Sequence, residues 1–359
     1  MNNTLFNLFN KEEILKMKKK KDKKPEKVKL IKAEVNLLKF PFYTLDKNRF
    51  KKIRSEEIEV KKGKTIIKSW EVSPDIELGL PGIFGMKILR VIEMFIFSDL
   101  MENGKVSEEL DIGSTYRICK ILGIAHQSSN RNLIREAIKR LAFLGFSTEN
   151  TFYYKEGRKL LTQTNFHLFD HKFKGEEFKD GRIADSNYIL IAPLYKNSIE
   201  NYYIKLLDFS YIKSLNSSIA IRLYEILGVK FFKIKDKKDI PLGFSYKKVC
   251  DLLPIKEQIN LSRIKQQLKP ALEELTKTKF LEKYILEKKG NKVFVKFYPG
   301  DKYYEDIKLD SAPKKKVLVE LKKTREILKE KEDDKKYKPM PKGFLNQIQG
   351  IIKQANNKF

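Results

Sequence analysis

The chain has 359 residues, and its 75 Lys and Arg against 47 Asp and Glu leave a formal net charge of +28 at pH 7. This length accommodates two or three domains with cores of their own, and 41% hydrophobic residues is usual for a folded protein, so disorder throughout is excluded. The positive charge exceeds what solubility requires and favours polyanionic partners, meaning nucleic acid or an anionic membrane surface.

Membrane insertion and export are both disfavoured by the sequence. The most apolar stretch, GIFGMKILRVIEMFIF, is interrupted by Lys87, Arg90 and Glu93, each of which is costly in lipid. The N-terminal segment MNNTLFNLFNKEEILKMKKKKDKK places its apolar residues before its lysines, the reverse of a secretory signal. We therefore predict a cytoplasmic protein without a membrane-spanning helix.

Metal and cofactor sites are not predicted. Cys119 and Cys250 are too few for a disulfide framework and too isolated for a thiolate metal site, so we expect both to be buried free thiols. His126, His167 and His171 do not form a cluster with metal-ligand spacing.

Composition shifts divide the chain into four predicted regions. Within the second of them, the runs IEVKKGKTIIKSWEV indicate a β-hairpin over residues 53–72 with Gly63 in its turn. The four regions are, in order, a flexible basic N-terminal arm (1–38), a first folded domain (39–180), a second folded domain (181–300) and a charged tail that ends in an amphipathic helix (301–359).

An internal repeat is the most informative feature of the sequence. An apolar helix at 86–97, TYRICKILGI, NRNLIREAIKRLAFLGF and a strand pair recur in the same order as SIAIRLYEILGVKFF, SYKKVCDLLPI, NLSRIKQQLKPALEELTKTKF and LEKYILEKKGNKVFVKFYP. Helix, helix, helix, hairpin is the order of a winged helix-turn-helix. We predict an α+β fold with two such domains in tandem, in which the matching residues are Tyr116 and Tyr246, Cys119 and Cys250, Ala137 and Ala271, Leu141 and Leu275, and Phe146 and Phe280.

The third helix of each copy is the candidate DNA-reading helix. In the first copy Arg131, Arg135 and Lys139 follow helical i, i+4 spacing, opposite an apolar side formed by Leu133, Ile134, Ala137, Ile138, Leu141 and Leu144. Such a stripe has two interpretations, a solvated helix face or a surface that contacts DNA. The repetition of the stripe, with a basic wing after each helix, favours DNA.

The candidate DNA-binding residues share hydrogen-bond donors or positive charge and lie on these helices or at the wing turns. Those of the first helix are Ser128, Ser129, Asn130, Arg131, Asn132, Arg135 and Lys139; those of the second are Ser262, Arg263, Lys265, Gln266, Gln267 and Lys269. The wing candidates are Lys155, Arg158 and Lys159 in the first copy and Lys288, Lys289 and Lys292 in the second. In the alternative interpretation, the wing lysines only solubilise the turns, and Gln266 and Gln267 face water without contacting DNA.

Pro270 departs from the pattern of a helix interior. Proline removes a backbone hydrogen bond and clashes with the preceding turn, so we expect it to kink the second DNA-reading helix or to split it in two.

The sequence resembles the plasmid replication initiator protein A family over roughly residues 39–300. FPFYTLDKN is similar to the aromatic motif with which that family begins, and WEVSPDIELGLPGIFGMKILRVIEMFIF to the strand, loop and first helix that follow. NYILIAPLYKNSIENYYIKLLDFSYIKSLNSSIAIRLYEIL resembles the family's junction between domains, and LKPALEELTKTKFLEKYILEKKGNKVFVKFYP its ending, proline included.

This resemblance implies a function. It implies binding to directly repeated duplex DNA sites at a plasmid origin, opening of adjacent AT-rich DNA, and recruitment of the host initiator and the replicative helicase. It also implies interconversion between a homodimer that represses its own promoter and a monomer that initiates replication.

Two enzyme classes and one regulator class are alternatives to an initiator that acts by binding. A nicking initiator needs a metal-binding His pair, but HLFDH at 167–171 has the wrong spacing, and an ATPase needs a glycine where this chain has Ile58 before the GKT at 63–65. We therefore predict no enzymatic activity. A winged-helix transcriptional repressor without origin function stays open, because only the location of its binding site distinguishes it from an initiator.

Both ends of the chain carry candidate partner-binding residues. Leu5, Phe6, Leu8 and Phe9 loosely resemble the short motif that docks proteins on the bacterial sliding clamp, but without its glutamine; the alternative is a short amphipathic helix that folds back on the domain. Near the C-terminus, one helical face can dock on the chain's own body, pair with a second copy or bind a host protein, and it is formed by Phe344, Ile348, Ile351 and Ile352.

Overall fold

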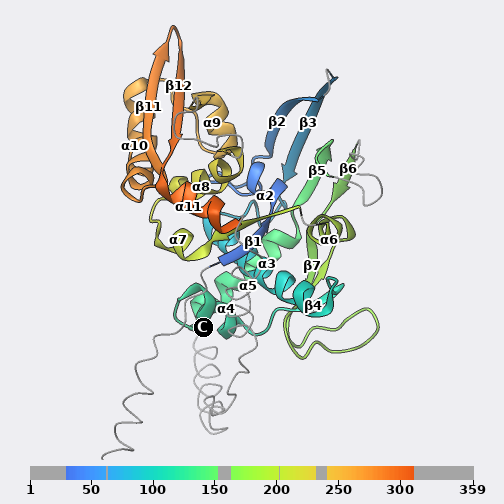
Figure 1. The fold of residues 1–359 in the computed structure, drawn as a ribbon. Helices are drawn as coiled ribbons and strands as arrows, with labels where there is room; N and C mark the ends of the chain where they lie inside the picture. The colour runs from blue at the N-terminus through green and yellow to red at the C-terminus, as the bar shows by residue number, and fades with distance from the viewer. Residues whose placement is uncertain (1–29, 62–63, 153–162, 202, 232–240, 311–359) are drawn as a thin grey trace, which may run out of the picture. The chain divides into compact units, whose positions relative to one another are not determined.

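The computed structural model describes residues 30–61, 64–152, 163–201, 203–231 and 241–310. Contacts divide the chain into two units, Met1–Leu328 and Lys329–Phe359, and every described residue belongs to the first. Helices and strands succeed one another along this unit, and the strand pairings among the described residues are all antiparallel (Figure 1). The predicted α+β class is confirmed.

The described chain begins with a buried strand and helix. Strand β1 (Leu30–Glu34) leads directly into α2 (Val35–Lys39) and pairs with β9 (Ile204–Asp208). Ala33 and Leu37 are fully buried. The structure therefore differs from the expected flexible arm over residues 30–38, because the apolar side chains between the charged ones pack into the core.

Three helices form the first repeat: α3 (Ile83–Asn103), α4 (Thr115–Leu122) and α5 (Ser128–Ala142). Helix α3 ends where Gly104 adopts a φ of +70°, the left-handed conformation that glycine adopts without strain. Helix α4 begins where the Ser114 hydroxyl accepts a hydrogen bond from a backbone N–H of the first turn. Among the described helices, none combines the length and the apolar character that a membrane crossing requires.

A four-stranded sheet lies beside these helices in the order β2-β3-β5-β6. Its long hairpin pairs Ile53 with Val72 at the base and Lys61 with Lys64 near the tip, so the predicted hairpin over 53–72 is confirmed, while Gly63 lies outside the described residues. The strands are β2 (Ile53–Lys61), β3 (Lys64–Ser73), β5 (Gly145–Glu149) and β6 (Thr164–Phe166).

A second sheet has the order β4-β8-β7, with β4 (Glu109–Asp111), β7 (Phe169–Lys172) and β8 (Tyr188–Ile191). His171 pairs with Ile189 across β7 and β8. The predicted boundary between residues 180 and 181 therefore falls between two paired strands of one sheet.

The second repeat follows α6 (Pro193–Glu200), β9 and α7 (Phe209–Ser214). It shows the same order of three helices and a hairpin as the first. Its elements are α8 (Ser218–Lys230), β10 (Leu242–Ser245), α9 (Tyr246–Leu252), α10 (Leu261–Lys277), β11 (Leu281–Lys289) and β12 (Lys292–Pro299), after which α11 (Asp301–Asp310) closes the described chain.

The hairpins of the two repeats differ in their sheets. In the second repeat β10 pairs with β12, which gives a three-stranded sheet in the order β10-β12-β11. In the first repeat the corresponding short strand, β4, pairs with β8 and not with the β5–β6 pair. The two repeats are therefore more alike in their helices than in the pairing of their strands.

Pro270 lies inside α10 without dividing it, so the expectation of a split helix is wrong. Pro270 is on the exposed side of the helix. A backbone carbonyl that loses its helical donor on this side can be hydrated by water, and the apolar stripe of α10 holds the turns on either side of the proline in one helix.

Candidate nucleic-acid interface

Helix α5 exposes one polar face and buries the opposite one. Ile134, Ala137, Ile138 and Leu141 are buried, as predicted for the apolar side. Leu133 is 48% exposed, so its assignment to that side is wrong: its position lies on the flank of the buried stripe. The exposed predicted residues are Ser128, Ser129, Asn132, Arg135 and Lys139, while Asn130 and Arg131 are half-buried.

Two cations of this face lie over an aromatic ring. The Arg135 guanidinium lies 5.1 Å from the centroid of the Phe173 ring, and the Lys139 ammonium lies 5.9 Å from it. Phe173 is 3% exposed and directly follows β7. Cation–π contacts of this kind restrict the two side chains while leaving their charges at the surface.

Asn130 has a structural contact. Its Nδ2 donates to the carbonyl oxygen of Ala125 at 2.7 Å, which ties the first turn of α5 to the loop that precedes it. The prediction placed Asn130 among the DNA-binding residues, and the structure gives it a hydrogen bond within the chain.

Helix α10 repeats the arrangement of α5. Its apolar stripe contains Ile264, Leu268, Ala271, Leu272 and Leu275, all buried. The predicted residues Ser262, Arg263, Lys265, Gln266 and Lys269 are exposed on the remaining surface. Lys269 forms an ion pair with Glu273 at 3.5 Å, and both partners are more than half exposed.

Gln267 differs from its neighbour because both ends of its carboxamide are used within the chain. Its Oε1 accepts from the Tyr246 hydroxyl at 2.6 Å, and its Nε2 donates to the carbonyl oxygen of Lys256 at 3.0 Å. The same hydroxyl accepts from the backbone N–H of Gln258 at 3.0 Å. Gln267 therefore fastens α10 to α9 and to the loop between them.

The hairpin predicted as the second wing carries its predicted lysines at the turn between β11 and β12. Lys288, Lys289 and Lys292 are exposed, and Gly290 allows the tight turn with a φ of +56°. Lys289 lies 3.5 Å from Glu287, which also binds Lys296 at 2.8 Å, and these contacts lower the pKa of the Glu287 carboxyl, with that of Lys296 the larger.

The remaining predicted residues lie outside the described residues. They are the wing residues Lys155, Arg158 and Lys159 of the first repeat and the partner candidates Leu5, Phe6, Leu8, Phe9, Phe344, Ile348, Ile351 and Ile352.

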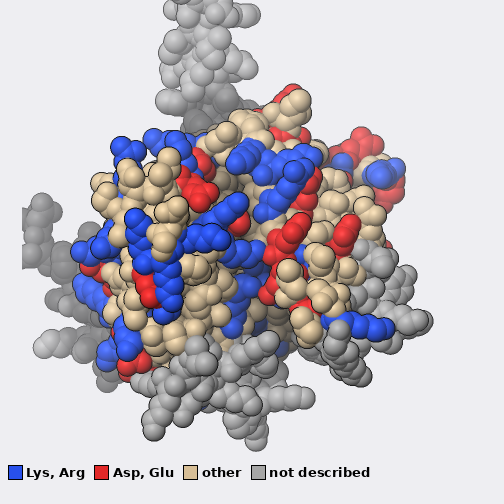
Figure 2. Space-filling model, turned by 90° about the horizontal axis from the view of Figure 1, so that it is seen from above, with Lys and Arg blue, Asp and Glu red and all other residues tan. Residues whose placement is uncertain are grey.

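Lysine and arginine cover more of one face of the molecule than aspartate and glutamate do. Figure 2 shows this face, toward which the β11–β12 and β2–β3 hairpins point in Figure 1. The acidic side chains among the described residues are often paired with cations, as Glu273 is with Lys269 and Glu136 with Arg140. Paired acids add little local negative potential, so the excess of positive charge dominates the field.

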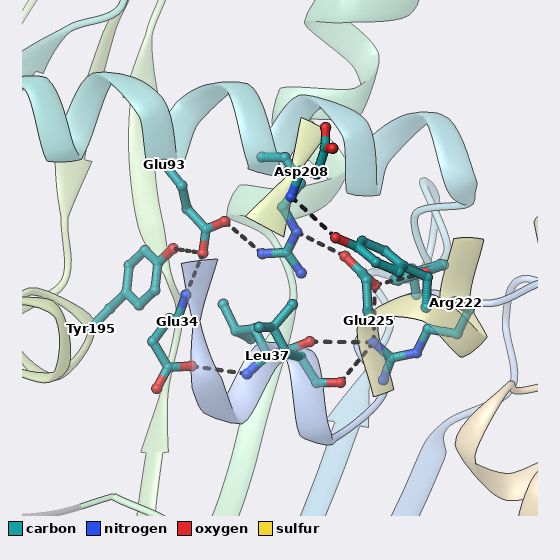
Figure 3. Close-up of polar contacts among 11 residues, drawn as sticks. Glu34, Leu37, Glu93, Tyr195, Asp208, Arg222 and Glu225 are labelled. Atoms are coloured by element: carbon teal, nitrogen blue, oxygen red, sulfur yellow. Dashed lines mark hydrogen bonds and ion pairs between the residues drawn. The ribbon is translucent and has the colours of Figure 1, made fainter. Parts of the chain in front are cut away.

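A buried polar network joins the first helices of the two repeats (Figure 3). Arg90 of α3 donates from Nη1 to Glu93 at 2.5 Å and from Nε to Glu225 of α8 at 2.9 Å. Glu225 also accepts from Arg222 at 3.2 Å and from the Tyr43 hydroxyl at 3.1 Å. All five side chains are fully buried, so each charge depends on its partners for solvation.

The network extends to the N-terminal strand and helix. Glu93 accepts from the backbone N–H of Glu34 at 3.0 Å and from the Tyr195 hydroxyl at 3.1 Å. The Glu34 carboxylate caps α2 through the Leu37 N–H at 2.9 Å and accepts from the Ser198 hydroxyl at 2.8 Å. Segments distant in sequence are thereby held to the same pair of helices.

Burial shifts the pKa values of two acidic groups in this network. Burial raises the pKa of Glu34 to about 7, although hydrogen bonds to its carboxylate oppose the shift. Burial also raises the pKa of Glu93, against the opposing effect of Arg90.

Sequence reasoning missed this network, although a signal was present. Arg90 and Glu93 were considered only as groups that lipid would exclude. Arg222 and Glu225 have the same spacing of three residues in the corresponding helix of the second repeat. A repeated Arg-x-x-Glu in two apolar helices is a pattern from which buried ion pairs can be predicted.

Other chemistry-bearing residues do not assemble into a site within the described part of the chain. Cys119 and Cys250 are buried free thiols, as predicted, and burial raises the pKa of the Cys250 thiol to about 11. No group of three or more His, Cys, Asp or Glu side chains suited to a metal ion occurs among the described residues.

The chain matches no protein-family model and no curated protein sequence. It resembles a crystal structure of a selenomethionine derivative of domains 2 and 3 of RctB, with a TM-score of 0.44 and 13% identity, over 74% of this chain and 98% of that chain. A second crystal structure of the RctB domains 2–3 has a TM-score of 0.38 and 15% identity, over 72% of this chain and 96% of that chain. Because both TM-scores are below 0.5, this likeness carries no argument about the function of the chain.

Proposed function

We propose that the chain is a replication initiator that binds repeated duplex DNA sites at a plasmid origin. Helices α5 and α10 enter successive major grooves as the recognition helices of two winged helix-turn-helix units, and the turn of β11 and β12 contacts the phosphate backbone. The protein acts by binding and not by catalysis, and needs no cofactor.

The observation that carries this proposal is the repetition of one surface. Each of the two helices buries an apolar stripe and exposes a face of serine, carboxamide and basic side chains. A major groove admits one such helix, and donors of this kind contact base edges and phosphates. The chain's net charge of +28 supplies the long-range attraction to DNA.

The buried network supports the use of both helices at one site. Arg90 and Glu225 join α3 to α8, and these helices pack against α5 and α10 respectively. Two reading helices on one rigid scaffold make the second contact intramolecular, which raises affinity without a further interface. A site of about two helical turns follows from this arrangement.

The later steps of initiation belong to the proposal through the family resemblance. They are the opening of AT-rich DNA, the recruitment of the host initiator, the replicative helicase and the sliding clamp, and a homodimer that represses the protein's own promoter.

The test is a binding titration of the purified full chain on duplex fragments that flank its own gene, repeated over a salt series. Two double variants, Arg135→Ala/Lys139→Ala in α5 and Arg263→Ala/Lys265→Ala in α10, are compared with Lys105→Ala/Lys179→Ala. The control removes the same charge from exposed lysines outside both helices.

Specific binding to direct repeats beside AT-rich DNA, weakened by both helix variants and unchanged in the control, is the expected result. Specific binding to a single promoter operator, without origin repeats, would indicate a transcriptional repressor and not an initiator. Equal binding to every fragment, or equal losses in the control, would overturn the proposal.

A further inference from the structure

The four carboxamides on the two candidate recognition helices fall into two pairs. Asn130 and Gln267 are used within the chain, as the contacts to Ala125, Tyr246 and Lys256 show. Asn132 and Gln266 are exposed, and neither carboxamide forms a hydrogen bond with any residue that the structure describes. The second pair therefore keeps both its donor and its acceptor available.

Asn132 and Gln266 hold equivalent places in the two repeats. Each lies five residues before the buried alanine of its helix, Ala137 or Ala271. Each also follows an exposed serine by four residues and precedes an exposed cation by three, in the sets Ser128, Asn132, Arg135 and Ser262, Gln266, Lys269. On a helix this spacing puts the three side chains on one face with the carboxamide in the middle.

The acidic side chains on these faces are already engaged. Glu136, one turn after Asn132, is paired with Arg140, and Glu273, two turns after Gln266, is paired with Lys269. A carboxylate bound to a cation is a poor acceptor for a cytosine amino group. The carboxamides are consequently the groups best placed for base recognition at the centre of each face.

We propose that Asn132 and Gln266 each recognise an adenine in the major groove, while exposed cations outside these ion pairs, such as Arg135, hold phosphates; this rests on the proposed function. A carboxamide offers a donor and an acceptor side by side, and adenine presents the matching N7 acceptor and N6 amino donor. Guanine presents two acceptors to the same groove, which a carboxamide cannot satisfy together. The preferred site therefore contains two such adenines about one helical turn apart.

The experiment begins with selection of binding sites from a random duplex DNA library by the full chain. The same selection is made with Asn132→Ala, with Gln266→Ala and with the matched control Gln267→Ala, which alters the adjacent carboxamide. The selected site is then synthesised with 7-deazaadenine in place of one adenine at a time, which removes the N7 acceptor alone.

The wild-type protein is expected to select a site with two adenines. Asn132→Ala should lose the preference for one of them and Gln266→Ala the preference for the other, while the control Gln267→Ala should keep both. The N7 substitution at one of these adenines should weaken wild-type binding about 5- to 150-fold, and should leave the matching alanine variant unaffected. Conservative Asn132→Gln should retain part of the preference.

Two results overturn the inference in distinguishable ways. If the wild-type protein selects a motif whose adenines survive in both alanine variants, the base-reading role fails and the proposed function stands. If the library yields no motif for the wild-type protein, the proposed function fails and the inference with it.

Discussion

Arg90 in α3 and Glu225 in α8 form an ion pair at 2.9 Å that is fully buried between the two repeats. Each residue also has a partner on its own helix three residues away, Glu93 for Arg90 and Arg222 for Glu225. The two repeats therefore contribute the same Arg-x-x-Glu pair to one network. This relationship fixes the helices against which α5 and α10 pack.

Loss of one member of the pair should be costly. Glu225→Ala leaves Arg90 and Arg222 without a shared carboxylate, and we expect unfolding free energy in urea to fall by about 3–5 kcal/mol. Glu109→Ala, which breaks the exposed pair with Arg182, should cost no more than about 1 kcal/mol. Equal effects of the two substitutions would show that the buried pair does not hold the repeats together.

The double variant Arg90→Leu/Glu225→Leu gives a second measure of the same pair. Its destabilisation should be smaller than the sum of the two single substitutions, because that sum counts the lost Arg90–Glu225 contact twice, although Glu93 and Arg222 still lose a partner in the double variant. Strict additivity would contradict a direct interaction.

Stability should fall as pH rises from about 5 to 7. The pKa of Glu34 is about 7 in the folded chain against 4.5 for an unperturbed glutamate, so between these values the folded state holds a proton that the unfolded state has released. The stabilisation is complete below the unfolded pKa and is lost as pH rises through the folded pKa. Glu93, whose pKa is also raised by burial, acts with the same sign.

Glu34→Gln should flatten this pH dependence. The raised pKa of Glu34 corresponds to a difference of about 3 kcal/mol in unfolding free energy between the two ends of this pH window. Urea unfolding midpoints of wild type and Glu34→Gln, measured from pH 5 to 8, provide the comparison. Carboxyls with lowered pKa, such as Glu57 and Glu71, titrate below this window. His171, whose pKa is lowered by burial, acts with the opposite sign within it, and the comparison of wild type with Glu34→Gln cancels that contribution because both proteins carry it. Parallel pH profiles for the two proteins would refute the assignment of this effect to Glu34.

The wing lysines should contribute affinity without sequence preference. Lys288 and Lys292 are exposed at the β11–β12 turn and form no ion pair with a described residue. Lys288→Ala/Lys292→Ala should lower the slope of log affinity against log salt by about 2, equally for specific and random duplexes. An unchanged slope, matching that of Lys105→Ala/Lys179→Ala, would show that Lys288 and Lys292 do not contact the phosphate backbone.

Gln267 should matter for folding and not for base preference. Gln267→Ala and Tyr246→Phe remove the same hydrogen bond, and each should lower unfolding free energy by about 1 kcal/mol in urea. The pair should be non-additive, since the second substitution finds the bond already lost. Independent effects would indicate that the 2.6 Å contact contributes nothing to stability.

The helical part of the fold could be predicted because its signals are local. The 3.6-residue period of apolar positions located α5 and α10, and alternating residues around Gly63 located the β2–β3 hairpin. Leu133 was misassigned because a residue at the flank of a stripe satisfies the same period as one at its centre.

The missed elements depend on partners far away in the sequence. Strand β1 is specified by pairing with β9, and β4 by pairing with β8, so no local pattern identifies them. The lysines within β1 and before it made this segment look like part of a flexible arm.

The sequence predicted which residue types form the candidate site, but not which of these residues contact the rest of the chain and which stay exposed. Gln266 and Gln267 are adjacent and chemically identical, yet they differ by about 100° around the helix. Only the positions of Tyr246 and Lys256 assign one of them to the interior contacts. The helical period places Gln267 beside the buried stripe, three residues after Ile264, but it does not show which partners its carboxamide meets there.

Hydroxyl-radical footprinting of the full chain on its selected duplex site tests the central claim most directly. We expect two protected stretches of sugar-phosphate backbone about one helical turn apart, one lost in Arg135→Ala/Lys139→Ala and the other in Arg263→Ala/Lys265→Ala. A footprint confined to a single protected stretch, unaffected by one of the two variants, would contradict a protein that reads DNA with both repeats.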